Sequence, residues 1–328
     1  MPAALSADSI LAGLEDFWAS LGGQKTASEP HALLRASAMT LIVIAEEAED
    51  PAAIAETIGE VMHDHPNRAI VVRLRPGTET LIEHRITAHC WMPFGGRRQI
   101  CCEQVEITAS GASLPGLLPI LTAIAAPDLP VVVWCRGARI YHLPAVGALA
   151  GISHKLIVDS TGFADVRAAL EDLAADAKRG RPVADLSWTR ITRWREIVAH
   201  IFDHPGRREF VRDMRQVKVF HAGDAPPASA YYLAGWVLAS IGHDDVAARF
   251  ESVAGAGIEG IVLDFDSHLV SIRRAQGGSV RIDIDSLAGC TVAPRLTEAE
   301  LLGNELAISG KDAVFQRSLE MAARLARR

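Results

Sequence analysis

The chain has 328 residues, of which 49% are hydrophobic and 22% are charged, and its net charge is −7. This length usually means two domains, and this composition is typical of a globular protein with a substantial core. The acidic balance argues against a nucleic-acid-binding protein, which usually concentrates basic residues on one face. Acidic residues near the N-terminus (Asp8, Glu15 and Asp16) argue against a signal peptide. Prolines and an aspartate divide the apolar stretch 116–135 into pieces too short to span a membrane.

The number of cysteines is odd, and no two of them have the CxxC spacing. A chain of this size needs no disulfides to hold a core together, so we expect reduced thiols and a cytoplasmic protein. The five cysteines are Cys90, Cys101, Cys102, Cys135 and Cys290.

The first half of the chain alternates strand and helix patterns. An amphipathic helix is expected at 8–21, before a polar linker. Continuous apolar runs at 40–45 and 69–75, separated by a helical pattern at 51–63, predict parallel strands joined by a right-handed crossover. The remaining expected elements are a hairpin of strands 82–92 and 97–108 with a glycine-containing turn, helix 114–126, strand 131–135, a short helix, strand 155–159 and helix 164–178.

The pattern changes after residues 180–182. A helix over 193–202 carries an apolar stripe at helical spacing. It is followed by strand 216–220, helices 229–241 and 244–253, strands 258–266, 268–274 and 279–285, and helices 297–306 and 311–326. The predicted fold is α/β: an N-terminal helix and linker (1–30), an α/β domain with a mixed, mostly parallel sheet and covering helices (31–180), and a smaller α+β domain with an antiparallel meander and C-terminal helices (181–328).

The segment 185–196 concentrates aromatic and basic residues. It holds two of the six tryptophans and three arginines, which are residue types enriched at the energetic centres of protein interfaces. Trp194 lies on the apolar stripe of its helix, which favours a place in the core, whereas Trp188 precedes that helix and is the better interface candidate. We therefore expect recognition rather than catalysis here. The candidate partner-binding residues are Trp188, Arg190, Arg193, Trp194, Arg195 and Glu196.

A second unusual block is Cys101, Cys102, Glu103 and Gln104 on a predicted strand. Adjacent cysteines on a strand point to opposite faces, so these two are not expected to pair with each other. Buried thiols are the simpler interpretation, and a redox sensor at Cys101 or Cys102 is the alternative. Glu103 and Gln104 suggest a functional role, because a strand interior needs a reason to host them.

Other motifs give weaker indications. Residues 255–260 match GxGxxG, but the predicted helix precedes the glycines instead of following them, so a turn into the meander is favoured over a cofactor site. Arg68, beside His65 and Pro66, could hold a phosphate at a helix-to-strand turn. The mixed-charge run at 207–215 is typical of a solvated surface.

No metal-binding, P-loop or catalytic-serine motif occurs, so neither a metal nor a cofactor is expected.

Several blocks, taken in order, resemble the glucose-6-phosphate dehydrogenase assembly protein family, OpcA. The most specific are residues 101–104 and 185–188 with 194–196. Two positions depart from the family pattern, since Arg193 replaces a common Pro and Cys135 replaces an often-present second Trp. The other matching blocks are 39–43, 65–68, 127–131 with Trp134, 159–160 and 232–236.

The resemblance implies a non-catalytic partner of glucose-6-phosphate dehydrogenase, which promotes assembly of the active oligomer and raises its activity. In some photosynthetic members this effect depends on thiol redox state, which is not carried over to this chain. The alternative is a sugar-phosphate or nucleotide-binding enzyme. Its site would lie at the carboxyl ends of the parallel strands, near Arg68, Trp134 and Asp159, where open α/β sheets bind ligands.

Overall fold

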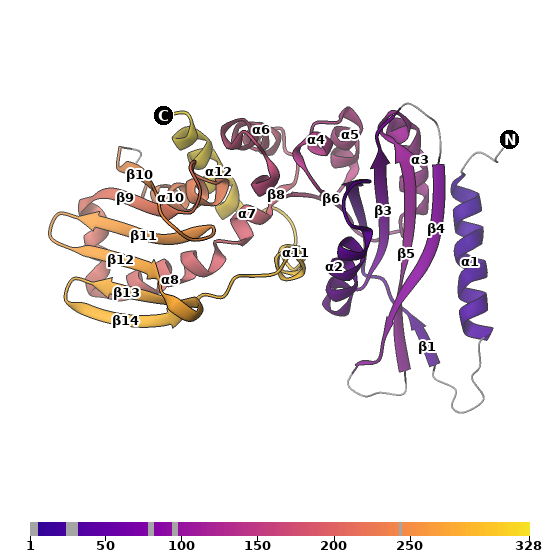
Figure 1. Cartoon of the computed structure of the whole chain (residues 1–328), viewed down its shortest axis with the longest axis horizontal. Coiled ribbons are helices and arrows are strands. Elements are labelled where there is room, and N and C mark those ends of the chain that lie inside the picture. The colour runs from indigo at the N-terminus through magenta and orange to yellow at the C-terminus, as the bar shows by residue number, and fades with distance from the viewer. Residues whose placement is uncertain (1–5, 24–31, 78–81, 94–97, 243–244) are drawn as a thin grey trace. The chain divides into compact units, whose positions relative to one another are not determined.

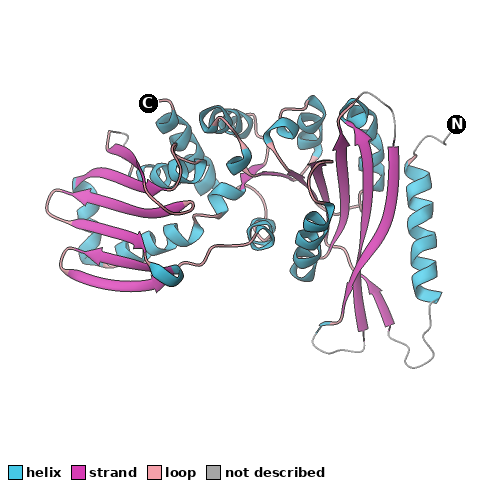
Figure 2. Cartoon of the chain, viewed as in Figure 1, coloured by secondary structure: helices cyan, strands magenta, loops and turns pink. Residues whose placement is uncertain are grey.

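The computed structural model describes residues 6–23, 32–77, 82–93, 98–242 and 245–328 (Figure 1). The chain divides into two compact units. The first unit comprises Met1–Val158 and Glu298–Gly310, and the second comprises Asp159–Thr297 and Lys311–Arg328. Each unit combines one sheet with several helices (Figure 2).

The first unit is built on a mixed, mostly parallel sheet. Its central strand β2 (Met39–Glu46) lies between β3 (Asn67–Arg75) and β6 (Val131–Cys135), both parallel to it. Outside β6 lies β7 (Lys155–Val158), and outside β3 lies β5 (Arg98–Ser110), again in parallel. The predicted crossover is therefore confirmed, because β2, the following helix and β3 form one parallel unit.

The long strand β5 uses both of its edges. One edge pairs with β3 and, near its beginning, with the short parallel strand β1 (Ala32–Arg35), which the sequence did not predict. The other edge pairs with the antiparallel strand β4 (Ile82–Trp91), which confirms the predicted hairpin strands. The predicted hairpin turn at 94–97 lies outside the described residues.

The helices of the first unit follow the expected apolar spacing. Asp50 caps α2 by accepting a hydrogen bond from the Ala52 amide at 2.9 Å, and Ile54 and Ile58 of α2 are buried. The late helix α11 packs against α2 and is held by a buried ion pair of Lys155 with Glu305. The helices of this unit are α1 (Ala7–Gly23), α2 (Pro51–Asp64), α3 (Leu114–Ile124), α4 (Ala138–Tyr141), α5 (Pro144–Ile152) and α11 (Glu298–Leu306), with a 3-10 turn at Gly111–Ser113.

The second unit is built on a largely antiparallel sheet in the order β10-β9-β11-β12-β13-β14. Only the β10–β9 pair is parallel. The predicted meander is confirmed and continues into a further strand, β14, which the sequence did not predict. The strands are β9 (Met214–His221), β10 (Ala247–Ser252), β11 (Ile258–Phe265), β12 (Leu269–Arg274), β13 (Ser279–Ile284) and β14 (Leu287–Val292).

The helix predicted at 244–253 is wrong, because the structure forms strand β10 there. Phe250 packs on Tyr231 with ring centroids 4.6 Å apart, and the β10 backbone pairs along β9. Pairing with a neighbouring strand therefore outweighs the local helical pattern. The glycines at 255–260 consequently join two strands and do not end a helix.

Helices of the second unit include a tightly packed pair, α10 and α12. A β-carbon on Gly235 of α10 would lie 2.8 Å from the Ala322 backbone nitrogen of α12, so this crossing requires glycine. The helices are α6 (Val166–Lys178), α7 (Leu186–Thr189), α8 (Thr192–Phe202), α9 (Pro205–Arg208), α10 (Ala228–Ile241) and α12 (Ala313–Ala326). Strand β8 (Val183–Asp185) and the 3-10 turns Ser160–Gly162, Glu209–Asp213 and Gln276–Gly278 complete the unit.

Candidate functional site

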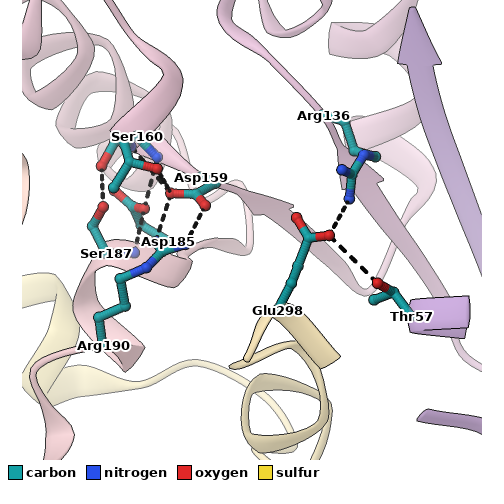
Figure 3. A network of polar contacts seen from close by, with 9 residues as sticks. Thr57, Arg136, Asp159, Ser160, Asp185, Ser187, Arg190 and Glu298 are labelled. Carbon is teal, nitrogen blue, oxygen red and sulfur yellow. Dashed lines mark hydrogen bonds and ion pairs between the residues drawn. The ribbon is translucent and has the colours of Figure 1, made fainter. Parts of the chain in front are cut away.

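The buried carboxylate of Asp185 organises the start of the 185–196 segment (Figure 3). Its side chain caps α7 by accepting a hydrogen bond from the Ser187 amide at 2.9 Å, and it also accepts one from the Ser160 amide at 3.1 Å. The Tyr232 hydroxyl of α10 donates to the second oxygen at 2.9 Å. Burial, together with the nearby charge of Asp159, raises the pKa of Asp185 to about 6.

Asp159 forms the second half of this network. The Arg190 guanidinium donates two hydrogen bonds to its carboxylate, at 2.7 and 2.6 Å (Figure 3). Burial disfavours the charged form of Asp159, but the hydrogen bonds and the charge of Arg190 outweigh this effect, so its pKa lies below the usual value. The pKa values of the two aspartates therefore shift in opposite directions, because only Asp159 has a cation beside it. The sequence-predicted residues Arg190 and Asp159 are thus brought together.

Trp188 lies inside an aromatic cluster. Its ring packs on Tyr232 and Phe315, with centroids 6.1 and 5.8 Å away, and its Nε1 donates to Asp312 at 3.2 Å. The Arg195 guanidinium stacks over the ring, 3.6 Å from the centroid. Only 2% of Trp188 is exposed. The expectation that this ring faces a partner is therefore wrong for the structure, and its place is in the core that joins α7, α10 and α12.

The other candidate partner-binding residues divide between core and surface. Trp194 is buried on the apolar stripe of α8, as predicted. Arg193 and Glu196 are half exposed and pair with each other at 3.1 Å. Arg193 also donates to the Val292 carbonyl and the Thr291 hydroxyl of β14, both at 3.0 Å. This arginine therefore connects the segment to the edge of the second sheet.

The outer edge of β14 carries no further strand within the described part of the chain. The strand contains no charged residue, and its two large apolar side chains, Leu287 and Val292, are 63% and 61% exposed. Between β13, β14 and α8 lies a groove of about 350 Å³, whose lining includes three basic residues. We call this surface the β14 groove. It is lined by Arg193, Ile197, His200, Ile201, Arg207, Ile282, Ile284, Leu287, Ala288, Gly289, Cys290 and Thr291.

In the first unit, Glu103 is the centre of a separate polar cluster. Its buried carboxylate accepts hydrogen bonds from Arg68, from Arg35 at 2.7 Å and from the Trp18 indole at 2.5 Å. Burial opposes ionisation, but the two arginines and the indole outweigh it, so the pKa of Glu103 is lowered. Gln104 contacts a ring nitrogen of His89 at 3.2 Å. The polar half of the 101–104 block therefore ties β5 to α1, β1, β3 and β4.

The cysteines of this block differ from expectation. Cys101 forms a disulfide with Cys90, its cross-strand partner in β4, so the prediction that all cysteines are reduced is wrong for the structure. Antiparallel pairing brings these two residues together, although neither shows a recognisable spacing in the sequence. Cys102 is buried, and burial raises the pKa of its thiol, which disfavours a reactive thiolate. Cys135 is also buried, whereas Cys290 is exposed on β14.

Arg68 does not lie at the carboxyl ends of the parallel strands, where the alternative ligand site was expected. Arg68 is the second residue of β3 and lies at the amino end of that strand, bound to Glu103. Trp134, in contrast, lies at the carboxyl end of β6, where it is buried under the Arg136 guanidinium at 4.4 Å. Figure 3 shows Arg136 turned toward Glu298, which it contacts at 2.9 Å. Parallel strands place their two ends at opposite edges of a sheet, so Arg68 and Trp134 cannot share one site.

Two further features of the described residues bear on function. None of their helices is both long and apolar enough to cross a bilayer. Within the same residues, no group of three or more His, Cys, Asp or Glu side chains is placed to hold a metal ion. The sequence reasoning did not single out Tyr232 or Asp312 as site residues, since their roles arise only when α10 and α12 pack beside α7.

Comparison with protein-family models gives two matches in chain order. Residues 58–175 match the model described as the glucose-6-phosphate dehydrogenase subunit N-terminal domain, and residues 181–319 match the corresponding C-terminal domain. Together these matches cover more than three quarters of the chain.

Two similar relatives carry the description "OxPP cycle protein OpcA". The protein from Nostoc punctiforme is 27% identical over 195 residues, which is 59% of this chain and 42% of the relative. The protein from Synechococcus elongatus is 26% identical over 236 residues, which is 71% of this chain and 49% of the relative. The chain therefore spans less than half the length of each of these relatives.

Among solved structures, the 3-ketoreductase KijD10 from Actinomadura kijaniata aligns with a TM-score of 0.49 and 11% identity. The alignment covers 88% of this chain and 96% of the reductase. This similarity is too low to support a statement about function.

Proposed function

Because the chain belongs to the family of glucose-6-phosphate dehydrogenase assembly proteins, OpcA, we propose that it is a cytoplasmic, non-catalytic assembly factor and allosteric activator of glucose-6-phosphate dehydrogenase in the oxidative pentose phosphate pathway. The observation that carries the proposal is the pair of family matches, which follow each other in order along the chain.

The physical basis of activation is preferential binding. A protein that binds only the active oligomer of an enzyme stabilises that oligomer by mass action and shifts the population toward it. Such a partner needs an accessible recognition surface, and it needs no catalytic residues of its own. The buried Asp185 and Trp188 clusters join α7, α10 and α12 and are not accessible to a partner.

The surface that best fits the dehydrogenase is the β14 groove. An exposed sheet edge offers unpaired backbone groups, and proteins usually protect such edges with charges or proline. β14 contains neither, and it exposes large apolar side chains. We assign the groove to an extended segment of the dehydrogenase, whose acidic residues would face Arg207 and Arg193 of the lining.

The test is a titration of this protein into glucose-6-phosphate dehydrogenase from the same source, in which coenzyme reduction and oligomer mass are followed together. The wild type is expected to raise specific activity and form a heavier complex. The double variant Leu287→Lys, Val292→Lys should lose both effects, because lysine on an edge strand blocks pairing. Leu269→Lys is the matched control, since Leu269 is a 47% exposed apolar residue of the same sheet outside the groove.

Labelling of the exposed thiol of Cys290 on β14 supplies a second readout. The dehydrogenase should protect this thiol from a maleimide reagent if it occupies the groove. Absence of any complex or rate change with the wild type would overturn the proposed function. A complex that tolerates the double lysine variant would move the interface elsewhere. Loss of a self-dimer in that variant would instead assign the groove to a second copy of the chain.

A further inference from the structure

A second pocket of the second unit is lined by four arginines. It has a volume of about 290 Å³ and lies between the start of α8, the start of α10, the 255–257 loop and the segment after β14. None of its lining residues is acidic. The lining includes the arginines Arg190, Arg193, Arg274 and Arg295, with Thr161 and Ser229 as further polar residues.

Neighbouring carboxylates satisfy three of these arginines. Asp159 binds Arg190, Glu196 binds Arg193, and Glu259 binds Arg295 at 3.0 Å. Glu259 lies 3.9 Å from Arg274, which is beyond hydrogen-bonding distance. Among the ion pairs of these four arginines, that of Arg274 is therefore the longest.

Arg274 is the residue left incompletely paired. It donates one hydrogen bond, to the Ala293 carbonyl at 2.8 Å, and its buried Nε has no hydrogen-bond partner. Burial, and then the like charge of Arg295, lower its pKa. A buried donor without an acceptor is costly, and an anion in the pocket would remove this cost.

The amino end of α10 adds to the attraction for an anion. Pro227 and Ser229 line the pocket, and no side chain caps the helix. The first backbone N–H groups of a helix lack intrahelical acceptors and carry the positive end of its dipole, which favours phosphate. The lining also contains apolar residues, among them Trp194, Pro294 and Leu296. The Trp194 ring lies next to Arg274, whose guanidinium carbon is 5.5 Å from the ring centroid.

We propose that this pocket binds a small phosphate ester, whose phosphate contacts Arg274, Arg295 and the start of α10 while its organic part lies against Trp194. A volume near 290 Å³ is at the small end of ligand pockets, so a sugar-sized ester fits and a whole dinucleotide does not. The proposal does not rest on the proposed assembly function, because the isolated chain contains the complete pocket.

The test is calorimetric titration of the isolated full chain with inorganic phosphate, glucose 6-phosphate and glucose. Glucose should not bind, and glucose 6-phosphate should bind more tightly than phosphate. Arg274→Gln and Arg295→Gln should each weaken ester binding about tenfold, as expected for the loss of a charge-assisted hydrogen bond. Arg281→Gln should bind like the wild type, since Arg281 is exposed on β13 and pairs with Asp283 outside the pocket.

Arg295→Gln keeps the test decisive if Arg274→Gln fails to fold, because the Arg295 side chain is 56% exposed and its removal leaves no buried gap. No binding of the ester at millimolar concentration would overturn the proposal. Equal affinities of Arg295→Gln and Arg281→Gln would place any binding elsewhere. An ester that binds no better than phosphate would overturn the assignment of its organic part to Trp194.

Discussion

At the scale of single residues, two neighbouring aspartates show how environment sets chemistry. Asp159 has a bidentate arginine and keeps its charge, whereas Asp185 accepts hydrogen bonds only from neutral donors. Desolvation and the charge of Asp159 both disfavour ionisation of Asp185. The effect of this buried carboxyl group on the free energy of unfolding should therefore depend on pH.

Asp185→Asn should gain stability relative to the wild type as pH rises. The pKa of Asp185 is raised from 3.8 to about 6, so between these values the folded state holds a proton that the unfolded state releases. The tighter proton binding of folded Asp185 therefore adds to the free energy of unfolding. This contribution is complete below pH 3.8 and is lost as pH rises through about 6, a change on the order of 3 kcal/mol. Asparagine has no charge to desolvate and retains an oxygen for the two amides. Urea unfolding of both proteins at about pH 5 and about pH 7.5 measures the part of this change that falls between the two pH values, about 1.4 kcal/mol.

Asp283→Asn is the control for this experiment. Asp283 is exposed, and hydrogen bonding by Arg281 lowers its pKa, so its titration falls below the tested range. The control should show the same stability difference at both pH values. A constant difference between Asp185→Asn and the wild type would mean that Asp185 is already ionised in the folded protein near pH 5.

Sequence reasoning succeeded unevenly at this scale. The helical spacing placed Trp194 in the core, because that position follows directly from a local pattern. Trp188 was misplaced because its neighbours, Phe315 and Asp312, lie more than a hundred residues away in the chain. The Cys90–Cys101 pairing was likewise invisible until the register of β4 and β5 was known.

At the scale of elements, the crossing of α10 and α12 sets the packing of the second unit. Gly235 allows the two backbones to approach, since a β-carbon there would lie 2.8 Å from the Ala322 nitrogen and 2.9 Å from the Ser318 oxygen. Backbone atoms of a helix cannot give way as a flexible side chain can. This contact therefore fixes the distance between the helices that hold Tyr232 and Phe315.

Gly235→Ala should destabilise the second unit by roughly 1–3 kcal/mol, because overpacking forces the helices apart. The same substitution at Gly151 is the matched control: Gly151 lies in α5 with nothing within 4 Å of the added carbon. Gly151→Ala should leave stability unchanged or increase it by up to about 1 kcal/mol, which is the helix propensity of alanine over glycine. Thermal unfolding followed by circular dichroism compares the melting temperatures of both variants with that of the wild type. An unchanged melting temperature in Gly235→Ala would show that the two helices can move apart without loss of stability.

Long periodic elements were predictable from the sequence, while short or edge elements were not. The parallel β2-α2-β3 unit follows from apolar runs around a helical pattern. In β10, Phe250 packs on Tyr231, and this strand forms by pairing with β9 and not from a local pattern. β14 lacks a buried face that would give it a pattern, since five of its six residues are exposed. The partner binding proposed for β14 rests on this exposure.

At the scale of the whole molecule, the end of the chain serves both units. The helix α11 completes the first unit, and α12 completes the second. Both helices were predicted from their spacing, but no local signal shows which partner an amphipathic helix will choose. In the first unit the choice is fixed by Lys155, whose Nζ donates to the Glu305 carboxylate at 2.9 Å and to the Glu305 and Ile308 carbonyls.

Glu305→Ala should therefore loosen the first unit selectively. The substitution leaves the buried Lys155 charge without its carboxylate, which costs roughly 3 kcal/mol in comparable buried pairs. Hydrogen-exchange mass spectrometry should show faster exchange in β2, β3 and α11, with α10 and α12 unchanged. Asn304→Ala, on the exposed face of α11, should leave exchange as in the wild type. Equal acceleration in α10 would mean that the two units unfold together, and a change at the ion pair in one unit would then weaken the β14 groove in the other.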